Sequence, residues 1–324
     1  MATVVEIGLA IDGFTPAPDI IDQARAAEAG GADTLWIATH LFQRDSVALA
    51  AAALAATDRL KLALMALSPY AMHPAHAAMA AATLDELYPG RVVLSLGVGA
   101  PADLRGAGLE SKRPLATLRE AVSICRALLA GETVEHEGEI FLVANRRLVN
   151  PTDNVPIILA ASGPKMLALS GSHTDGVIVS GATSAPFVSA CLDRVAAGAA
   201  DRSVRKAGII YTHIEDVARV AENPVRRTLG FILRGEHHAE NIRLGGAALD
   251  QAVLRDAFAT EDWATVDSLI SDEVIAAHAA CGDVDTVRGR FAEYAAAGLD
   301  HLIVSGIADP EDIERTLKAV APGG

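Results

Sequence analysis

The segment "ASGPKML" brings together residue types that bind anions. Ser162 and Gly163 stand directly before Pro164, and proline favours the first turn of a helix. Free backbone N–H groups and the positive end of the helix dipole would meet at this point, and Lys165 adds a positive charge. The segment therefore fits a phosphate, although it also fits a tight turn that only starts a helix.

Two further pairs of small residues stand at the ends of apolar runs. Ser180 and Gly181 follow "DGVIV" and could contact the same phosphate as the turn above. Gly97 and Gly99 follow "VVLSL", and glycine allows a flat ligand to approach the backbone closely. A turn that needs a positive φ explains the same two glycines equally well.

His40 is the candidate general acid or base, because it ends an apolar run and its charge changes near neutral pH. A lone histidine is also often a structural group. The sequence has no HExxH motif, no carboxylate-rich calcium loop and no His/Cys cluster, so we expect no metal. A GxSxG nucleophile motif is absent too. The three cysteines are far apart, and we expect small buried hydrophobic residues there.

These residues must be positioned by alternating strands and helices. Eight apolar runs are each followed by a helical pattern, and they cover 4–11, 32–40, 60–67, 91–99, 155–162, 175–181, 207–214 and 299–306. Continuous apolar runs indicate strands buried on both faces, as in parallel sheets. Eight such units predict an α/β fold, a (β/α)₈ TIM barrel with insertions. A doubly wound sheet is the rival, but no GxGxxG motif follows the first strand.

The barrel is expected to form one domain over residues 1–324. Two segments do not fit the simple repeat: a small hairpin or loop near "EIFLV", and a mainly helical insertion at about 216–281. In such a barrel the active site lies at the C-terminal ends of the strands, where all the residues above are placed. The residues alone thus predict a glycine-lined mouth with a phosphate site, and they do not identify a reaction.

Charge and composition exclude several classes of partner. The formal net charge is −14, and no cluster of Lys and Arg stands out, so we expect neither nucleic acid nor an anionic membrane surface as a partner. The longest alanine-rich stretch is far shorter than the roughly 20 residues that span a bilayer. The N-terminal sequence lacks the features of a signal peptide. We expect a cytoplasmic protein.

Three stretches together resemble the bacterial luciferase-like superfamily: "HPAHAAMAAATLDELYPGRVVLSLGVG", "AASGPKMLALSGSHTDGVIVSG" and "GLDHLIV". The resemblance covers essentially the whole chain. It is greatest for the branch of oxidoreductases that depend on coenzyme F420, a deazaflavin. The stretches "SPYAMHPA" and "GPKML" resemble the methylenetetrahydromethanopterin reductases in particular.

The resemblance implies where a cofactor would be bound. Family members hold the flavin-like ring at the mouth of the barrel, beside a bulge after strand three that often contains a non-prolyl cis peptide; here this bulge maps to Met65–Ala66. The implied cofactor contacts are Thr39, Met65, Ala66, Ser68, Gly97, Gly99, Ala161, Ser162, Gly163, Pro164, Lys165, Ser180 and Gly181.

The resemblance also implies that His40 is the catalytic histidine of an Asp-His pair found in deazaflavin dehydrogenases. Here Thr39 stands where that pair has its Asp. A threonine cannot orient or charge-stabilise His40 as a carboxylate would. The segment "APADLRG" also lacks the pattern of the sugar-phosphate dehydrogenases, which disfavours a glucose 6-phosphate type of substrate.

The expected function is that of an oxidoreductase transferring a hydride between coenzyme F420 and a small organic substrate. An FMN-dependent luciferase-like monooxygenase is the alternative, because such enzymes share the scaffold. A non-catalytic flavin-binding relative is a third hypothesis, because Thr39 stands in place of the Asp of the Asp-His pair. The family resemblance further implies a homodimer.

Overall fold

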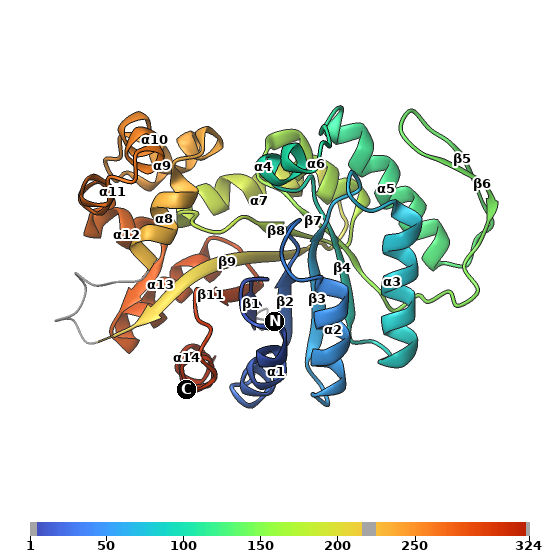
Figure 1. The fold of residues 1–324 in the computed structure, drawn as a ribbon, viewed down its shortest axis with the longest axis horizontal. Coiled ribbons are helices and arrows are strands. Elements are labelled where there is room, and N and C mark those ends of the chain that lie inside the picture. Colours follow the sequence, from blue (N-terminus) through green and yellow to red (C-terminus); the bar gives the residue numbers. More distant parts are fainter. Residues whose placement is uncertain (1–4, 216–224, 322–324) are drawn as a thin grey trace.

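Eight parallel strands close into a barrel in the computed structural model, which describes residues 5–215 and 225–321 (Figure 1). The barrel strands are β1 (Glu6–Ile11), β2 (Thr34–Ala38), β3 (Lys61–Leu67), β4 (Val92–Leu96), β7 (Ile157–Ala160), β8 (Gly176–Val179), β9 (Arg205–Ile214) and β11 (His301–Ser305). They pair in this order, and β11 pairs with β1 to close the ring. The predicted α/β barrel is therefore confirmed, and all eight predicted strands are present.

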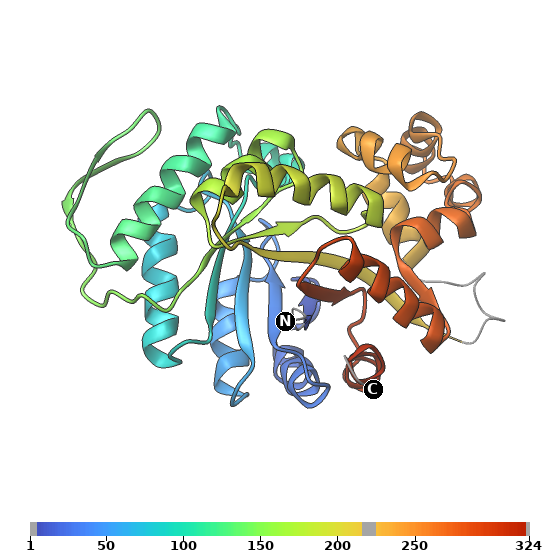
Figure 2. The same cartoon turned by 180° about the vertical axis from the view of Figure 1, so that it is seen from behind.

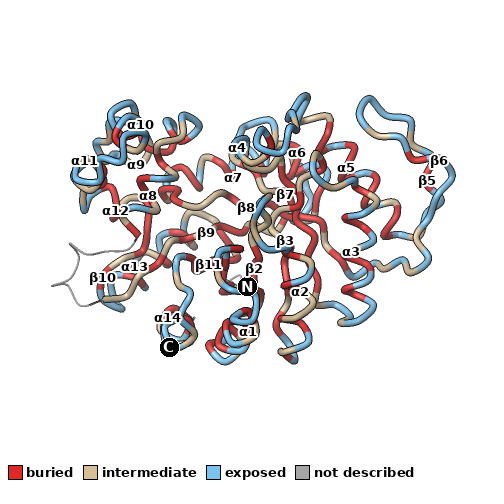
Figure 3. Tube along the Cα trace, in the orientation of Figure 1, coloured by how far each residue is buried: buried red, intermediate tan, exposed pale blue. Residues whose placement is uncertain are grey.

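Each barrel strand buries both of its faces. One residue from every strand fills the barrel interior: Ala10, Trp36, Ala63, Val93, Ile158, Ile178, Ala207 and Ile303. The alternate residues, such as Leu9 and Leu35, point outwards into a larger apolar layer beneath the helices. In Figure 3 the strands are accordingly buried over most of their length, whereas the outer turns of the helices are exposed. Burial on both faces explains why the strands appear in the sequence as continuous apolar runs.

Eight helices cover the outside of the barrel. They are α1 (Ile20–Ala29), α2 (Ser46–Ala55), α3 (Pro74–Leu87), α5 (Pro114–Leu129), α6 (Pro164–His173), α7 (Ala185–Ala199), α13 (Val284–Ala296) and α14 (Pro310–Val320). Several begin with proline, as predicted. His73 caps α3, because its Nδ1 accepts a hydrogen bond from the N–H of Ala75 at 3.1 Å. No helix within the described part of the chain is long and apolar enough to span a bilayer.

Two insertions lie at opposite ends of the molecule, as both views show (Figures 1 and 2). The hairpin of β5 (Val134–Glu137) and β6 (Leu142–Arg146) projects beside α5, as predicted near "EIFLV". At the other end the described residues after β9 form five short helices: α8 (Val225–Leu233), α9 (Ala239–Gly245), α10 (Gln251–Ala259), α11 (Trp263–Leu269) and α12 (Asp272–His278). They share a separate apolar core.

Two short elements differ from the prediction. The helical insertion, expected to reach residue 281, ends at His278, and Ala280–Gly282 form the strand β10 beside β9. Its expected first part, residues 216–224, lies outside the described residues. A short helix, α4 (Pro101–Gly106), follows β4 and was not predicted. It has only six residues, and of these only Leu104 is buried, so no helical period is visible in the sequence.

Candidate functional site

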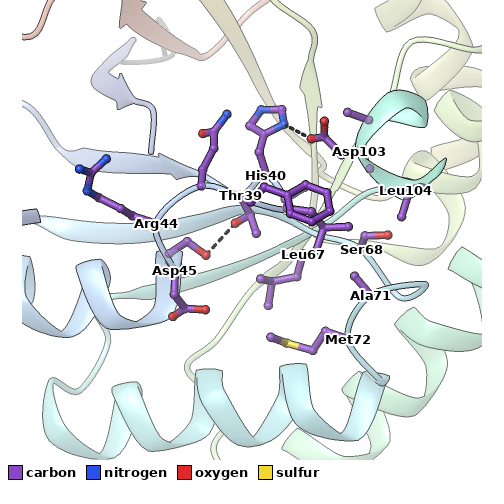
Figure 4. Close-up of a pocket in the computed structure, with 17 residues that line it drawn as sticks. Thr39, His40, Arg44, Asp45, Leu67, Ser68, Ala71, Met72, Asp103 and Leu104 are labelled. Carbon is purple, nitrogen blue, oxygen red and sulfur yellow. Dashed lines mark hydrogen bonds and ion pairs between the residues drawn. The ribbon is translucent and has the colours of Figure 1, made fainter. Parts of the chain in front are cut away.

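A cavity of about 200 Å³ opens at the C-terminal ends of β2, β3 and β4 (Figure 4). Five of the predicted site residues line it: Thr39, His40, Ala66, Ser68 and Gly99. The loop after β2 and the helix α4 complete the wall, and the lining is largely apolar, with Leu67, Met72 and Leu104 among its members. The structure thus brings residues from three strand ends together at the C-terminal end of the barrel, although they are far apart in the sequence.

The end of β3 leaves the regular strand geometry at the predicted bulge. The peptide bond between Met65 and Ala66 is cis, and the register between β3 and β4 shifts between Leu64 and Leu67. The non-prolyl cis peptide expected at Met65–Ala66 is therefore present. The chain continues into Ser68, whose hydroxyl donates a hydrogen bond to the carbonyl oxygen of Val98 at 2.7 Å. This bond holds the loop after β3 against the end of β4.

The two glycines after β4 are required by close packing and by backbone conformation. A Cβ atom on Gly97 would lie 3.0 Å from the Cβ of Ala66 and 3.3 Å from that of Ala160. Gly99 has a φ of +90°, which L side chains rarely adopt, and a Cβ there would lie 3.1 Å from Ser68. Both glycines thus let β4 pass close to the bulge of β3.

His40 and Thr39 point in different directions. The hydroxyl of Thr39 donates a hydrogen bond to Ser46 Oγ at 2.7 Å, at the start of α2. His40 Nδ1 lies 3.2 Å from the Oδ2 of Asp103, which α4 presents from the opposite side of the cavity (Figure 4). His40 therefore has a carboxylate partner, which comes from the segment after β4 and not from the neighbouring position in the chain.

Asp103 is the residue that the sequence interpretation missed. It lies in "APADLRG", which was considered only for its departure from the sugar-phosphate dehydrogenases. The contact with His40 joins positions 63 residues apart, so no local pattern reveals it. One signal in the sequence could have indicated the role of Asp103: its carboxylate follows the glycines after β4, in a loop that must border the mouth of the barrel.

The predicted phosphate turn lies at the N-terminus of α6 and borders a second cavity. Ser162, Gly163 and Pro164 line this cavity of about 290 Å³, together with Arg194 of α7. Gly163 is the N-cap of α6 and provides no side-chain hydrogen bond to the first turn. Pro164 has no N–H, and the N–H groups of Met166 and Leu167 donate to the Gly163 carbonyl oxygen at 3.0 Å, so Lys165 provides the backbone N–H of this turn that can meet a ligand or water. Ala161 is buried, whereas Lys165 is exposed and is not among the lining residues.

Ser180 and Gly181 directly follow β8 and begin a loop that other parts of the fold hold in place. The hydroxyl of Thr183 donates a hydrogen bond to the Ser180 carbonyl oxygen at 3.1 Å. A Cβ on Gly181 would lie 2.8 Å from the ring of Tyr211, so only glycine fits beside that ring. Burial raises the pKa of Tyr211, with the negative charge of Asp12 acting in the same direction.

Arg44 and Asp45 are the other charged groups in the wall of the first cavity, and both are engaged elsewhere. The guanidinium of Arg44 donates hydrogen bonds to the carbonyl oxygens of Gly13 and Phe14 at 3.0 and 2.9 Å. Asp45 caps α2 by accepting from the N–H of Ala48 at 2.8 Å. In Figure 4 both lie on the far side of the loop from His40. His40 and Asp103 are therefore the groups available for proton transfer at this cavity.

Among the described residues, one cluster of acidic and histidine side chains has the spacing of metal ligands, and it lies at the other end of the barrel. Glu6, Asp33 and His301 place ligand atoms within 4.8 Å of one another at the N-terminal ends of the strands. The guanidinium of Arg205 already fills this position, with an ion pair to Glu6 and a second to Asp33 at 3.3 Å. Because a cation would be repelled by Arg205, the cluster is a structural ion-pair network.

Comparison with known proteins places these features in a family. The sequence model described as luciferase-like monooxygenase matches residues 3–301. The 5,10-methylenetetrahydromethanopterin reductase of Methanolobus tindarius is 28% identical over 311 residues, which cover 94% of this chain and 95% of that protein. The F420-dependent glucose-6-phosphate dehydrogenase of Nocardia farcinica is 30% identical over 306 residues, covering 88% and 87%.

A solved structure has the same fold. The coenzyme F420 dependent tetrahydromethanopterin reductase of Methanopyrus kandleri superposes with a TM-score of 0.89, covering 98% of this chain and 97% of that one, at 23% identity.

Proposed function

Because this chain belongs to the luciferase-like monooxygenase family, we propose that it is an oxidoreductase which transfers a hydride between coenzyme F420 and a small organic substrate. The observation that carries the proposal is the cavity at the barrel mouth, where a histidine–carboxylate pair faces the glycine-lined bulge of β3 and β4. Relatives that match along most of the chain are named as F420-dependent or as methylenetetrahydromethanopterin reductases.

The residues at the mouth fit a flat ring with a phosphate-bearing chain. Gly97 and Gly99 leave open the space that side chains would fill beside Ala66 and Ser68. At α6, the first turn after Ser162 and Gly163 offers the backbone N–H of Lys165 to a phosphate. We propose that Thr39, Met65, Ala161, Pro164, Lys165, Ser180 and Gly181 complete the cofactor site. When bound, the deazaflavin supplies the hydride chemistry.

The protein's contribution is then to orient the substrate and to move a proton. The apolar wall formed by residues such as Leu67 and Met72 excludes water, which favours hydride transfer over competing reactions. His40 is the group we propose as acid or base, with its ring facing a cavity of about 200 Å³ that suits a small substrate. By the same family relation we propose a cytoplasmic homodimer, which sedimentation of the purified protein would test.

Cofactor binding tests the proposal directly. Purified protein is titrated with F420 and with FMN, followed by fluorescence, and we expect saturable binding of F420 and much weaker binding of FMN. Lys165→Ala should weaken F420 binding about 2- to 5-fold, since an exposed charge contributes up to about 1 kcal/mol. Lys318→Ala, which removes an exposed lysine paired with Glu314, is the matched control and should bind F420 normally. Tight FMN binding without F420 affinity would instead support the monooxygenase alternative.

A further inference from the structure

We propose that Asp103 is a positioning residue for His40, and that it takes the place of the carboxylate that Thr39 cannot provide. The inference rests on the proposed function and concerns how the histidine is held. Its starting point is the distance of 3.2 Å between His40 Nδ1 and Asp103 Oδ2 across the cavity. A carboxylate at this distance accepts a hydrogen bond from the ring nitrogen.

The geometry determines which nitrogen of His40 carries the proton. A carboxylate is only an acceptor, so the neutral ring must have its proton on Nδ1 to make this bond. Its Nε2 is then unprotonated and is free to accept a proton in the cavity. The side chains are 42% and 30% exposed, so a substrate could reach the ring without displacing Asp103.

The neighbouring residues leave this role to Asp103. Thr39 is committed to Ser46, at 2.7 Å, and faces α2. Arg44 and Asp45 are the other charged groups of the cavity wall, and they bond to Gly13 and Phe14 and to the first turn of α2, respectively. Nothing else charged in the described cavity wall competes with Asp103 for His40.

A purely structural role for Asp103 is the alternative explanation. The residue lies in the first turn of α4, where a negative charge interacts favourably with the helix dipole and stabilises the helix. However, Asp103 makes no capping hydrogen bond to the α4 backbone, and its carboxylate points across the cavity (Figure 4). The contact that the structure gives its carboxylate is the one with His40.

The chemistry follows from the free Nε2. In the oxidative direction a bound deazaflavin would supply the hydride acceptor, and Nε2 of His40 would accept the proton from the substrate heteroatom, so that two electrons and both hydrogens would leave the substrate. The imidazolium that results is stabilised by the carboxylate of Asp103 and then releases the proton to water. In the reductive direction the same imidazolium returns the proton. Asp103 does not itself exchange a proton with the substrate.

Spectroscopy of the cofactor-free protein tests the positioning role independently of activity. Two-bond ¹H–¹⁵N correlation spectra report which ring nitrogen is protonated, and the His40 signal is identified by its absence in His40→Ala. We expect the Nδ1–H form in the wild-type protein. In Asp103→Asn, whose amide can donate to Nδ1, we expect a shift towards the Nε2–H form. The same ring form in both proteins would overturn the proposal.

Kinetics with F420 provides the second readout. Asp103→Asn should lower kcat about 10- to 100-fold with little change in KM, and it should shift the limb of the pH profile that belongs to the base. Asp103→Glu should recover part of the rate. Ala102→Gly, which weakens α4 at an exposed position without touching the pair, should keep the wild-type ring form and pH profile.

These experiments distinguish a failure of the role proposed for Asp103 from a failure of the proposed F420-dependent function. If Ala102→Gly changes the pH profile as much as Asp103→Asn does, Asp103 acts only through the stability of α4 and the inference is wrong. If the wild-type protein fails to turn over any substrate with F420, the proposed function fails, while the ring-nitrogen measurement still decides whether Asp103 holds His40.

Discussion

Single residues set the shape of the cavity, and Gly99 shows how. Its positive φ turns the chain after β4 towards α4, and the lack of a side chain lets Ser68 approach Val98. Gly108, in the turn after α4, also has a positive φ of +72°, but nothing lies within 4 Å of the place where its Cβ would be. A side chain at Gly108 would therefore meet only the unfavourable backbone conformation, whereas a side chain at Gly99 would also meet a steric contact with Ser68.

Substituting these two glycines should give different results. Gly99→Ala and Gly108→Ala should each lose about 1 kcal/mol of unfolding free energy through the unfavourable φ. Gly99→Ala should lose about 1 kcal/mol more, because the methyl group would press on Ser68 at 3.1 Å. Urea unfolding measures the stabilities, and only Gly99→Ala should weaken F420 binding. Equal losses of stability and of F420 binding in the two variants would show that the added methyl group does not press on Ser68.

The residues that sequence interpretation could assign are those whose role is local. His73 stands before Pro74, and both the sequence and the structure place it at the start of a helix. The anion turn at Ser162 and Gly163 is likewise visible in the sequence as a Gly-Pro helix start. The partner of His40 could not be predicted, because Asp103 meets it only through the folding of the barrel.

At the scale of elements, the helical insertion docks on the loop that follows β8. The side chain of Asn241 accepts from the N–H of Ser184 and donates to the carbonyl oxygen of Ala182, both at 2.8 Å. From α13, the hydroxyl of Tyr294 donates to the Thr183 carbonyl oxygen at 2.6 Å. These contacts fix the loop that begins with the proposed phosphate contact at Ser180.

His278 makes this docking sensitive to acid. Its side chain is buried in the described structure. Burial lowers its pKa to about 4 and the charge of Arg290 acts in the same direction, while hydrogen bonding to the backbone of Ala182 opposes the shift. His238, in the same insertion, has a pKa of about 4, also mainly because of burial. Protonation of either ring would place a charge inside the docked insertion.

The protein should therefore lose stability between pH 6.5 and pH 4. An unfolded histidine binds its proton near pH 6.5, whereas buried His278 resists it down to about pH 4, so acid favours the unfolded chain. At pH 5 the contribution of His278 lowers the free energy of unfolding by about 2 kcal/mol relative to pH 8. His278→Phe should reduce the difference by that amount in urea unfolding, whereas the exposed His237→Phe should not. An unchanged pH dependence in His278→Phe would contradict the assignment.

The elements that were predicted well are long or strongly patterned. The barrel strands are continuous apolar runs bounded by glycines and helix starts, so their number and order could be inferred. The strand β10 has only three residues, and it exists because β9 extends beyond the barrel and offers a free edge. Such short elements depend on their neighbours and leave no period in the sequence.

At the scale of the whole molecule, the two ends of the barrel have different tasks. The C-terminal ends of the strands carry the cavity, and the N-terminal ends carry the ion-pair network of Arg205, Glu6, Asp33 and His301. A hydrogen bond from His301 lowers the pKa of Glu6, and the charge of Arg205 acts in the same direction. This network joins four strand starts around the barrel.

Removing Arg205 should affect stability but not chemistry. Arg205→Met should lower the unfolding free energy by about 2 kcal/mol, because the partly buried carboxylates of Glu6 and Asp33 lose the positive charge that they share, although Asp33 keeps its ion pair with Lys61. Turnover measured well below the melting temperature should match the wild type. Arg315→Met, which breaks an exposed ion pair with Asp312, should change stability by less than about 0.5 kcal/mol. A large loss of turnover in folded Arg205→Met would link the two ends of the barrel.

The closure of the barrel by β1 and β11 also governs how the chain can be made. Residues 6–9 pair with residues 301–304, so during synthesis β1 lacks one of its two neighbours until β11 has been made. Until then β1 presents an open edge, and a growing sheet with open edges can pair wrongly with other nascent chains. We therefore expect the yield of closed barrel to depend on how well that edge is shielded until β11 is available.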